Sequence, residues 1–274
     1  MHTTALTHSS AGSVGRGVWE RAWKNEPTDA KDARLLDRER RGPRWTAIVE
    51  QLEQTFGTLD GLRTVELGSG RGDLSVLLAQ RGAVVTLLDY TPGALTSARR
   101  RFQRLGLSGE FVQGDMLGSL AEQRGRFDVA LSSGVIEHFK GTQRTQVVQA
   151  HRHVLRQGGI AIISVPHAWC LPYRLWKGCL ELRGWWPYGM EIPYSKRELT
   201  DRARRAGFVR TAARTMCFWQ SVGDHCGRGL FGRGPDWIEK VSWLDRFMGV
   251  TLLLFAWRDG DRELVGADGE AVCP

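Results

Sequence analysis

Three glycines with single residues between them follow an apolar run in the stretch "TVELGSGRGDLS". They are Gly68, Gly70 and Gly72, and Glu66 precedes them near the end of that run. Glycine loses more backbone entropy on folding than any other residue, so its repetition here indicates that something approaches the main chain closely. The helix predicted after the loop begins with unpaired N–H groups, which suit an anionic or polar ligand.

Two further carboxylates stand at the ends of the next two apolar runs. Asp89 ends "AVVTLLD", 17 residues after Gly72, and Asp115 follows "FVQG". The spacing of Asp89 is close to that at which an acidic residue binds ribose hydroxyls in nucleotide-binding folds. Each acid alone is explained equally well as a helix cap or a loop residue. Their common position after strands favours one shared ligand site.

The elements that must position these residues alternate between strand and helix. Strands are predicted at 62–68, 83–89, 109–115, 127–134, 160–166, 209–219 and 249–258, and helices at 74–82, 92–106, 145–157, 195–208 and 235–248. This order predicts an α/β fold, a Rossmann-like seven-stranded and mostly parallel sheet with helices on both faces. Residues 1–16 are predicted to be a disordered tail and 17–58 an N-terminal helical cap. Residues 59–274 then form the main domain, with an aromatic-rich insertion at 167–194 after the fifth strand.

The composition is that of a soluble globular protein with a formal net charge of +8 and a pI of about 9.6. Such a field attracts nucleic acid, acidic lipid or anionic substrates, although a general preference for arginine explains it equally well. The five cysteines form no CxxC pair, which favours reduced thiols over a disulfide framework. The N-terminus lacks the apolar core of a signal peptide, so we expect a cytoplasmic protein.

The motifs "VELGSGRGDLS", "VTLLDYTPGALTSAR", "FVQGDML" and "FDVALSSGVIEHF" resemble those of class I S-adenosylmethionine-dependent methyltransferases. The resemblance covers residues 60–166 and, more loosely, 195–257. The glycine pattern E-x-G-x-G-x-G differs from the G-x-G-x-x-G of dinucleotide folds. The sequence is most similar to small-molecule enzymes of the type that includes the ubiquinone-biosynthesis O-methyltransferases. Their Glu-His dipeptide appears here as Glu137-His138.

The resemblance implies S-adenosylmethionine as the cofactor and assigns a role to each motif. The loop would line the methionine part of the cofactor, Asp89 would hold the ribose, and Asp115 would take the adenine amine. The full set of implied cofactor-binding residues is Glu66, Gly68, Ser69, Gly70, Gly72, Asp89, Tyr90, Asp115, Met116 and Ser133. In this family N-terminal helices can close over the cofactor, which draws attention to Trp19, Trp23, Arg40, Arg41 and Arg44.

A sulfonium methyl group is already activated, so the enzyme mainly has to align donor and acceptor. A base is needed only where the acceptor must lose a proton. His138 is the first candidate because it follows the fourth strand and has an ordinary pKa of about 6.5. His167, after the fifth strand, is the second. Each is alternatively a structural histidine. Glu137 and His138 alternatively hold a divalent metal, but the sequence shows no third ligand, so no metal is expected.

Aromatic residues crowd the insertion at 167–194. Aromatic side chains give large contact areas at little entropic cost and stack on flat ligands. The residues predicted to contact the substrate are Trp169, Tyr173, Trp176, Trp186 and Tyr188. The alternatives are a second small core and a peripheral membrane contact, since Trp beside Arg and Lys suits a lipid interface.

The sequence therefore predicts an S-adenosylmethionine-dependent methyltransferase that acts on a small, apolar or aromatic acceptor. A nucleic-acid methyltransferase is the nearest alternative, but "SSGVIEH" stands where amino-methylating enzymes carry [DNS]-P-P-[YFW]. A stable nucleic-acid partner is therefore not expected. A non-catalytic S-adenosylmethionine-binding regulator is the alternative outside the enzymes. The sequence fixes neither the acceptor atom nor the oligomeric state.

Overall fold

The computed structural model describes residues 15–23, 27–118, 120–227 and 242–259. The strands are β1 (Arg63–Leu67), β2 (Val84–Asp89), β3 (Glu110–Gln113), β4 (Phe127–Ser133), β5 (Leu155–Pro166), β6 (Arg210–Met216) and β7 (Thr251–Trp257). The helices are α1 (Arg16–Ala22), α2 (Asp29–Arg41), α3 (Pro43–Phe56), α4 (Asp73–Ala79), α5 (Pro92–Arg104), α6 (Gln143–Val154), α7 (Leu171–Leu182), α8 (Lys196–Arg205), α9 (Phe218–Ser221) and α10 (Asp245–Met248). Short turns are η1 (Ala121–Gln123), η2 (Ile136–His138) and η3 (Val222–Gly227).

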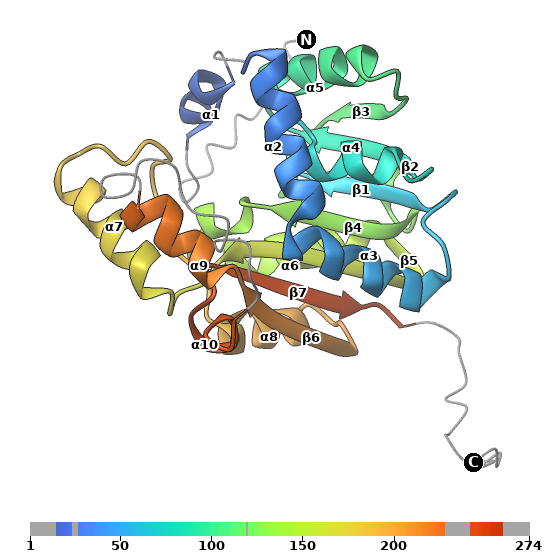
Figure 1. The fold of residues 1–274 in the computed structure, drawn as a ribbon. Helices are drawn as coiled ribbons and strands as arrows, with labels where there is room; N and C mark the ends of the chain where they lie inside the picture. The colour runs from blue at the N-terminus through green and yellow to red at the C-terminus, as the bar shows by residue number, and fades with distance from the viewer. Residues whose placement is uncertain (1–14, 24–26, 119, 228–241, 260–274) are drawn as a thin grey trace, which may run out of the picture.

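The strands form one sheet in the order β3-β2-β1-β4-β5-β7-β6 (Figure 1). The five strands from β3 to β5 are parallel, and β7 runs antiparallel to both of its neighbours. The predicted seven-stranded, mostly parallel sheet is confirmed. The chain order reverses between β1 and β4, and open α/β sheets bind ligands at the carboxyl ends of strands beside such a switch point.

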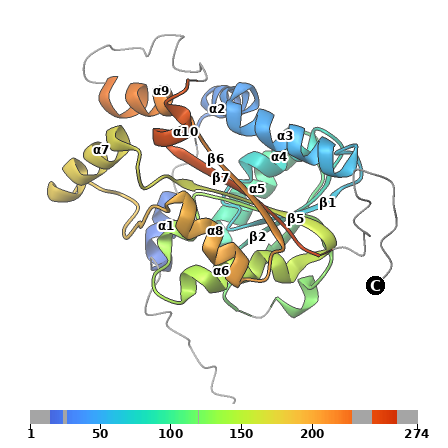
Figure 2. The ribbon, with the colours of Figure 1, turned by 90° about the horizontal axis from the view of Figure 1, so that it is seen from below.

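Two apolar cores separate the helices onto the two faces of the sheet. Strand β5 shows the alternation: Ile160 and Ile162 face one core, whereas Ala161 and Ile163 face the other. The first core contains the apolar sides of α3, α4 and α5, and the second contains those of α6 and α8. Figure 2 shows α3 and α4 on one side of the sheet and α6 and α8 on the other. The prediction of helices on both faces is thus confirmed.

Local signals in the sequence set several helix ends. Pro92 occupies the first turn of α5, where its missing N–H costs nothing. Before α8, the Ser195 hydroxyl accepts a hydrogen bond from the Glu198 N–H at 3.1 Å, as its capping sequence predicts. Gly82 adopts a positive φ of 86° soon after α4 ends.

Tertiary pairing moves more than one predicted boundary. The strand predicted at 209–219 ends at Met216, the last residue that pairs with β7, and Phe218 begins α9. The helix predicted at 145–157 ends at Val154, because Leu155 pairs with Phe127 of β4 and is fully buried. The register of this pairing shifts between Phe127 and Val129, and Gly158 there has φ 71°. The residues from Leu155 onward fit a helical period, but strand pairing makes them the start of β5.

The two ends of the chain are described in part. Residues 1–14 of the predicted tail lie outside the described residues, and α1 begins at Arg16, inside that predicted tail. The predicted N-terminal cap forms three helices, α1 to α3. Of the helix predicted at 235–248, residues 235–241 lie outside the described part, and α10 accounts for four residues of the rest. None of the helices in the described ranges has the length and apolar character needed to cross a membrane.

Candidate active site

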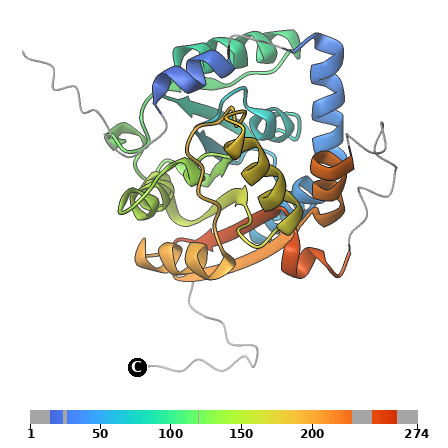
Figure 3. The ribbon, with the colours of Figure 1, turned by 90° about the vertical axis from the view of Figure 1, so that its left-hand side faces the viewer.

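A cavity of about 630 Å³ opens at the carboxyl ends of β1, β2 and β4. Figure 3 looks at this side of the molecule, where α1 and α7 lie in front of the sheet. Nine of the ten predicted cofactor-binding residues line the cavity: Glu66, Gly68, Ser69, Gly70, Asp89, Tyr90, Asp115, Met116 and Ser133. Gly72 does not line it. The structure therefore brings together residues from four separate sequence motifs.

The glycine loop needs glycine for two reasons that the structure shows. Gly68, Gly70 and Gly72 have φ values of 69°, 53° and 70°, a region that other residues rarely adopt. A Cβ atom on Gly70 would lie 2.6 Å from the Trp23 ring, and one on Gly72 would lie 2.4 Å from Leu87. Gly72 thus serves packing behind the loop, which explains why it stands outside the cavity wall.

One loop side chain carries an unused hydrogen-bonding group. The Ser69 hydroxyl is buried and has no partner, and Ser69 lines the cavity. A buried hydroxyl without a partner is costly, so its presence in a cavity wall is an observation that fits a polar ligand.

Asp89 organises the loop as well as facing the cavity. Its Oδ2 accepts a hydrogen bond from the Gly70 N–H at 2.9 Å. Its Oδ1 accepts from the Thr91 N–H at 2.9 Å and from the Thr91 hydroxyl at 2.6 Å. A carboxylate offers about four acceptor positions, so these three bonds leave capacity for a ligand hydroxyl.

Glu66 lies at the floor of the cavity and is almost fully buried. Its Oε2 accepts from the Ser75 N–H at 3.1 Å and from the Ser75 hydroxyl at 2.5 Å. Burial raises the pKa of the Glu66 carboxyl to about 7, because the charged form loses its hydration. A cation placed beside it would restore the charged form.

Asp115 and Met116 form the wall beyond β3. The Asp115 Oδ1 accepts a hydrogen bond from the Leu117 N–H at 2.9 Å, which fixes the turn that presents the carboxylate. Met116 is 8% exposed, and Tyr90 lines the same cavity from the end of β2. A carboxylate that shares a cavity wall with a methionine and a tyrosine can bind a flat ring with an amine.

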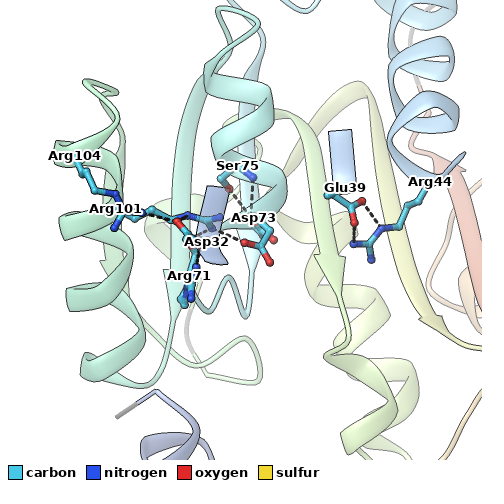
Figure 4. A network of polar contacts seen from close by, with 9 residues as sticks. Asp32, Glu39, Arg44, Arg71, Asp73, Ser75, Arg101 and Arg104 are labelled. Atoms are coloured by element: carbon cyan, nitrogen blue, oxygen red, sulfur yellow. Dashed lines mark hydrogen bonds and ion pairs between the residues drawn. The ribbon is translucent and has the colours of Figure 1, made fainter. Parts of the chain in front are cut away.

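Arg44 of α3 reaches the cavity and was one of three arginines suggested by the sequence. Two of its nitrogens bind the two oxygens of Glu39, at 2.8 and 2.7 Å (Figure 4). Its third, Nη1, donates to the hydroxyls of Ser133 at 2.5 Å and Ser164 at 3.3 Å. The other two suggested arginines lie elsewhere: Arg40 donates to Gln80, and Arg41 pairs with Asp37 on the exposed side of α2.

Helix α1 and the residue directly after it supply an aromatic wall: Trp19 lies in α1, and Trp23 follows its last residue, Ala22. Trp19 and Trp23 both line the cavity, and the Trp23 ring lies against Gly70. The Trp19 ring meets the His138 ring edge-on, with 4.8 Å between ring centroids. The sequence placed these tryptophans among helices that close over a cofactor, but only the fold shows their contacts with the loop and with His138.

His138 lines the cavity from η2, directly after β4. Its Nδ1 lies 2.9 Å from the Met190 carbonyl oxygen, so Nδ1 carries the proton and Nε2 is the free acceptor in the neutral ring. Burial lowers the pKa of His138 to about 4. The ordinary value expected from the sequence therefore does not hold, and the ring is neutral near pH 7.

Glu191 joins the Glu137-His138 pair from the far end of the insertion. One ligand atom from each of the three residues lies within 4.8 Å of the others. Burial raises the pKa of Glu137 to about 8 and that of Glu191 to about 7. The expectation that this pair lacks a third potential ligand is wrong. Two carboxylates and an imidazole suit a divalent cation, and Glu137 Oε2 is buried without a partner.

His167 is not among the residues that line the cavity. It is buried, its backbone N–H donates to the Val250 carbonyl at 2.8 Å, and its Nδ1 has no partner. Burial lowers the pKa of its ring to about 4. A role as second base stays a prediction without support from its position.

The predicted substrate-contacting aromatics also stand outside the cavity wall. Four of them, Tyr173, Trp176, Trp186 and Tyr188, pack on one another with ring centroids 5.4 to 6.5 Å apart. The fifth, Trp169, is 67% exposed. This arrangement matches the alternative of a second small core. The insertion still serves the cavity indirectly, because its Met190 carbonyl holds the His138 ring.

The fold and the site define a cofactor-binding α/β protein, and comparisons with known proteins identify the family. A family profile described as a methyltransferase domain matches residues 65–159. The ubiquinone biosynthesis O-methyltransferase of Bordetella pertussis is 30% identical over 171 residues, which cover 60% of this chain and 69% of the relative. That of Leptothrix cholodnii is 33% identical over 114 residues, covering 41% of this chain and 48% of the relative.

Among solved structures, the magnesium protoporphyrin IX methyltransferase of Synechocystis with bound SAH is similar at 18% identity and a TM-score of 0.56. The match covers 89% of this chain and 94% of that one, and it shows the fold. The chain belongs to the class I S-adenosylmethionine-dependent methyltransferases. It spans about half the length of the first curated relatives that it matches.

Proposed function

We propose that the protein binds S-adenosylmethionine in the cavity at the sheet edge and transfers its methyl group to a small, apolar or aromatic acceptor. One observation carries the proposal: a single cavity gathers the glycine loop, Asp89, Asp115 and His138. The similarity to ubiquinone biosynthesis O-methyltransferases and to a structure with bound SAH supports it. When bound, the cofactor supplies an electrophilic methyl group on a sulfonium.

Different residues of the cavity would bind different parts of the cofactor. Ser69 and the loop backbone would receive the methionine part, and Glu66 would face its cationic side. Arg44, held by Glu39, would meet its carboxylate. Asp89 would bind the ribose hydroxyls with its remaining acceptor capacity, and the wall beyond β3 would hold the adenine.

The acceptor would enter between His138 and the two tryptophans Trp19 and Trp23. These rings make that side of the cavity apolar, which favours an aromatic or apolar acceptor and excludes water from the reacting atoms. The neutral Nε2 of His138 can take the proton of an acceptor hydroxyl as the transfer proceeds, while Nδ1–H stays bonded to the Met190 carbonyl.

The proposal is tested first by binding and then by product. Calorimetry should show micromolar binding of S-adenosylmethionine or S-adenosylhomocysteine, a typical range for enzyme ligands. Incubation with methyl-labelled donor and fractionated cell extract should then label a small molecule. Label confined to RNA would instead favour the nucleic-acid alternative, for which the net charge of +8 is the supporting observation. Cofactor binding without label in any fraction would favour the non-catalytic alternative.

Replacing His138 tests its role as the base. We expect His138→Gln to lower turnover of the identified acceptor about hundredfold, a typical size for a general base, while cofactor affinity changes less than threefold. Wild-type turnover should not follow the ionisation of His138 between pH 6 and 9, because its pKa of about 4 keeps it neutral there. Full activity of the variant would remove His138 as the base. Loss of wild-type activity on chelation would assign it to a metal with Glu137 and Glu191.

Peripheral membrane contact by the insertion stays a prediction. Its support is that Leu171, Leu175 and Leu182 of α7 are more than half exposed, together with Trp169 and Trp185. Sedimentation with anionic lipid vesicles would test it. Its outcome does not bear on the cofactor site.

A further inference from the structure

The glycine loop is anchored differently in its two halves. In the first half, the Gly68 and Ser69 N–H groups donate to the Leu88 carbonyl at 2.8 and 3.0 Å, and the Gly70 N–H donates to Asp89. Strand β2 therefore fixes this half. The second half, from Arg71 to Asp73, is held by side chains from outside the sheet, as Figure 4 shows.

Asp32 of α2 is the centre of these contacts. It is 3% exposed, and its Oδ1 pairs with Arg71 of the loop. Its Oδ2 pairs with the Nε of Arg101 at 3.0 Å and also with Arg104, both on α5. One buried carboxylate thus ties the N-terminal cap, the loop and α5 together.

Arg101 grips the loop directly. Its Nη1 donates to the Arg71 carbonyl oxygen at 3.2 Å and to the Asp73 carboxylate. Arg101 is 3% exposed, so solvent screens these contacts little. Asp32 fixes the guanidinium of Arg101 from the other side, and the orientation of Arg101 in turn fixes the main chain at Arg71. Arg71 and Asp73 line the cavity, whereas Asp32 and Arg101 do not.

We propose that Asp32 is a positioning residue that sets cofactor affinity from outside the cavity, by clamping the second half of the glycine loop through Arg71 and Arg101. The inference rests on the proposed function, since the loop is the part of the site that receives the methionine end of the cofactor. It gives the N-terminal cap a role besides roofing the cavity. A loop with three left-handed glycines has many alternative conformations, and the clamp removes them before the ligand binds.

Asp32→Asn tests the clamp because it keeps the shape of the side chain and removes its charge. We expect the calorimetric affinity for S-adenosylhomocysteine to fall at least tenfold. Amide exchange at residues 70–74 should accelerate, whereas exchange at residues 84–89 of β2 should stay as in the wild type. The matched control is Asp37→Asn on the same helix, whose partner Arg41 is exposed; neither residue lines the cavity. It should change neither quantity by more than twofold.

Arg101→Lys is the second variant and keeps the proposal testable if Asp32→Asn does not fold. Lysine retains the charge and loses the guanidinium that spans Asp32, Asp73 and the Arg71 carbonyl. It should also weaken affinity at least tenfold. Folded variants with affinity and loop exchange within twofold of the wild type would overturn the clamp, even if they melt earlier. A wild-type protein that binds no S-adenosylhomocysteine would instead overturn the proposed function itself.

Discussion

Two regions of the molecule, the glycine loop and the insertion at 167–194, differ in how far their sequence predicts their structure. The glycine loop and the carboxylates beside it lie where their motifs place them. The loop follows β1, Asp89 ends β2 and Asp115 follows β3, and these three strands are neighbours in the sheet. The insertion residues have no such frame. Their aromatic rings pack on one another and leave the cavity wall to Trp19 and Trp23. Composition alone therefore does not locate a substrate pocket.

The interactions that hold the two regions in place differ as well. In the loop, backbone conformation and a few hydrogen bonds fix the site, so small steric changes should act on ligand binding. In the insertion, ring contacts and the buried Lys177 ammonium over Trp186, at 4.9 Å, stabilise a local cluster. Changes there should act on stability first. The following predictions test this difference, from the largest expected effect to the smallest.

Gly70→Ala should disrupt the glycine loop and weaken cofactor binding. The new methyl group would lie 2.6 Å from the Trp23 ring at a φ of 53°, so the aromatic wall or the loop must move. We expect cofactor affinity to fall about hundredfold, equivalent to about 2.7 kcal/mol. Gly106→Ala is the matched control, because it has a φ of 66° but nothing within 4 Å of the new methyl group. Both variants should lose about 1 kcal/mol of stability, and only the first should lose affinity.

A Gly70→Ala protein that binds the cofactor within threefold of the wild type would mean that Trp23 yields freely. The loop would then be no more sensitive than the insertion, and the contrast between the two regions would fail.

Trp186→Ala should affect the insertion and spare the loop. Trp186 contacts Tyr173, Trp176 and Tyr188, so its removal should cost about 2 kcal/mol of unfolding free energy, less than for a fully buried tryptophan. Cofactor affinity should stay within twofold. The neighbouring Trp185 is 68% exposed, and Trp185→Ala should cost less than about 0.5 kcal/mol.

Denaturant unfolding and calorimetry measure both quantities for these tryptophan variants. If Trp186→Ala instead kept its stability and lost turnover of the acceptor, the predicted substrate contact would be right and the second-core interpretation wrong.

The smallest expected effect is the release of protons from Glu66 when the cofactor binds. Its pKa of about 7 in the free protein leaves about half of the carboxyls protonated at pH 7. A cationic methionine end beside it would lower that pKa, so binding should release about half a proton at pH 7. Calorimetry in buffers of different ionisation enthalpy measures this release. Glu66→Gln should abolish it, and proton uptake by the wild type would contradict the placement of Glu66.

The sequence by itself determined the parallel part of the sheet, the glycine loop and the carboxylates at the strand ends. These features depend on local patterns: strand length, helix period, and residues that must follow a strand directly. Even so, some boundaries were wrong. The helical period included Leu155, and only pairing with Phe127 shows it to be strand. The strand predicted at 209–219 ends at Met216, and Phe218 begins a helix.

Only the tertiary structure decided which residues from distant segments meet. Asp32 and Arg101 are 69 positions apart, and Glu191 joins Glu137 across the insertion. It also decided the protonation of His138, whose burial lowers its pKa far below the ordinary value. The physical reason is common to all three: burial and side-chain pairing depend on what packs nearby in space, and no spacing along the chain encodes that.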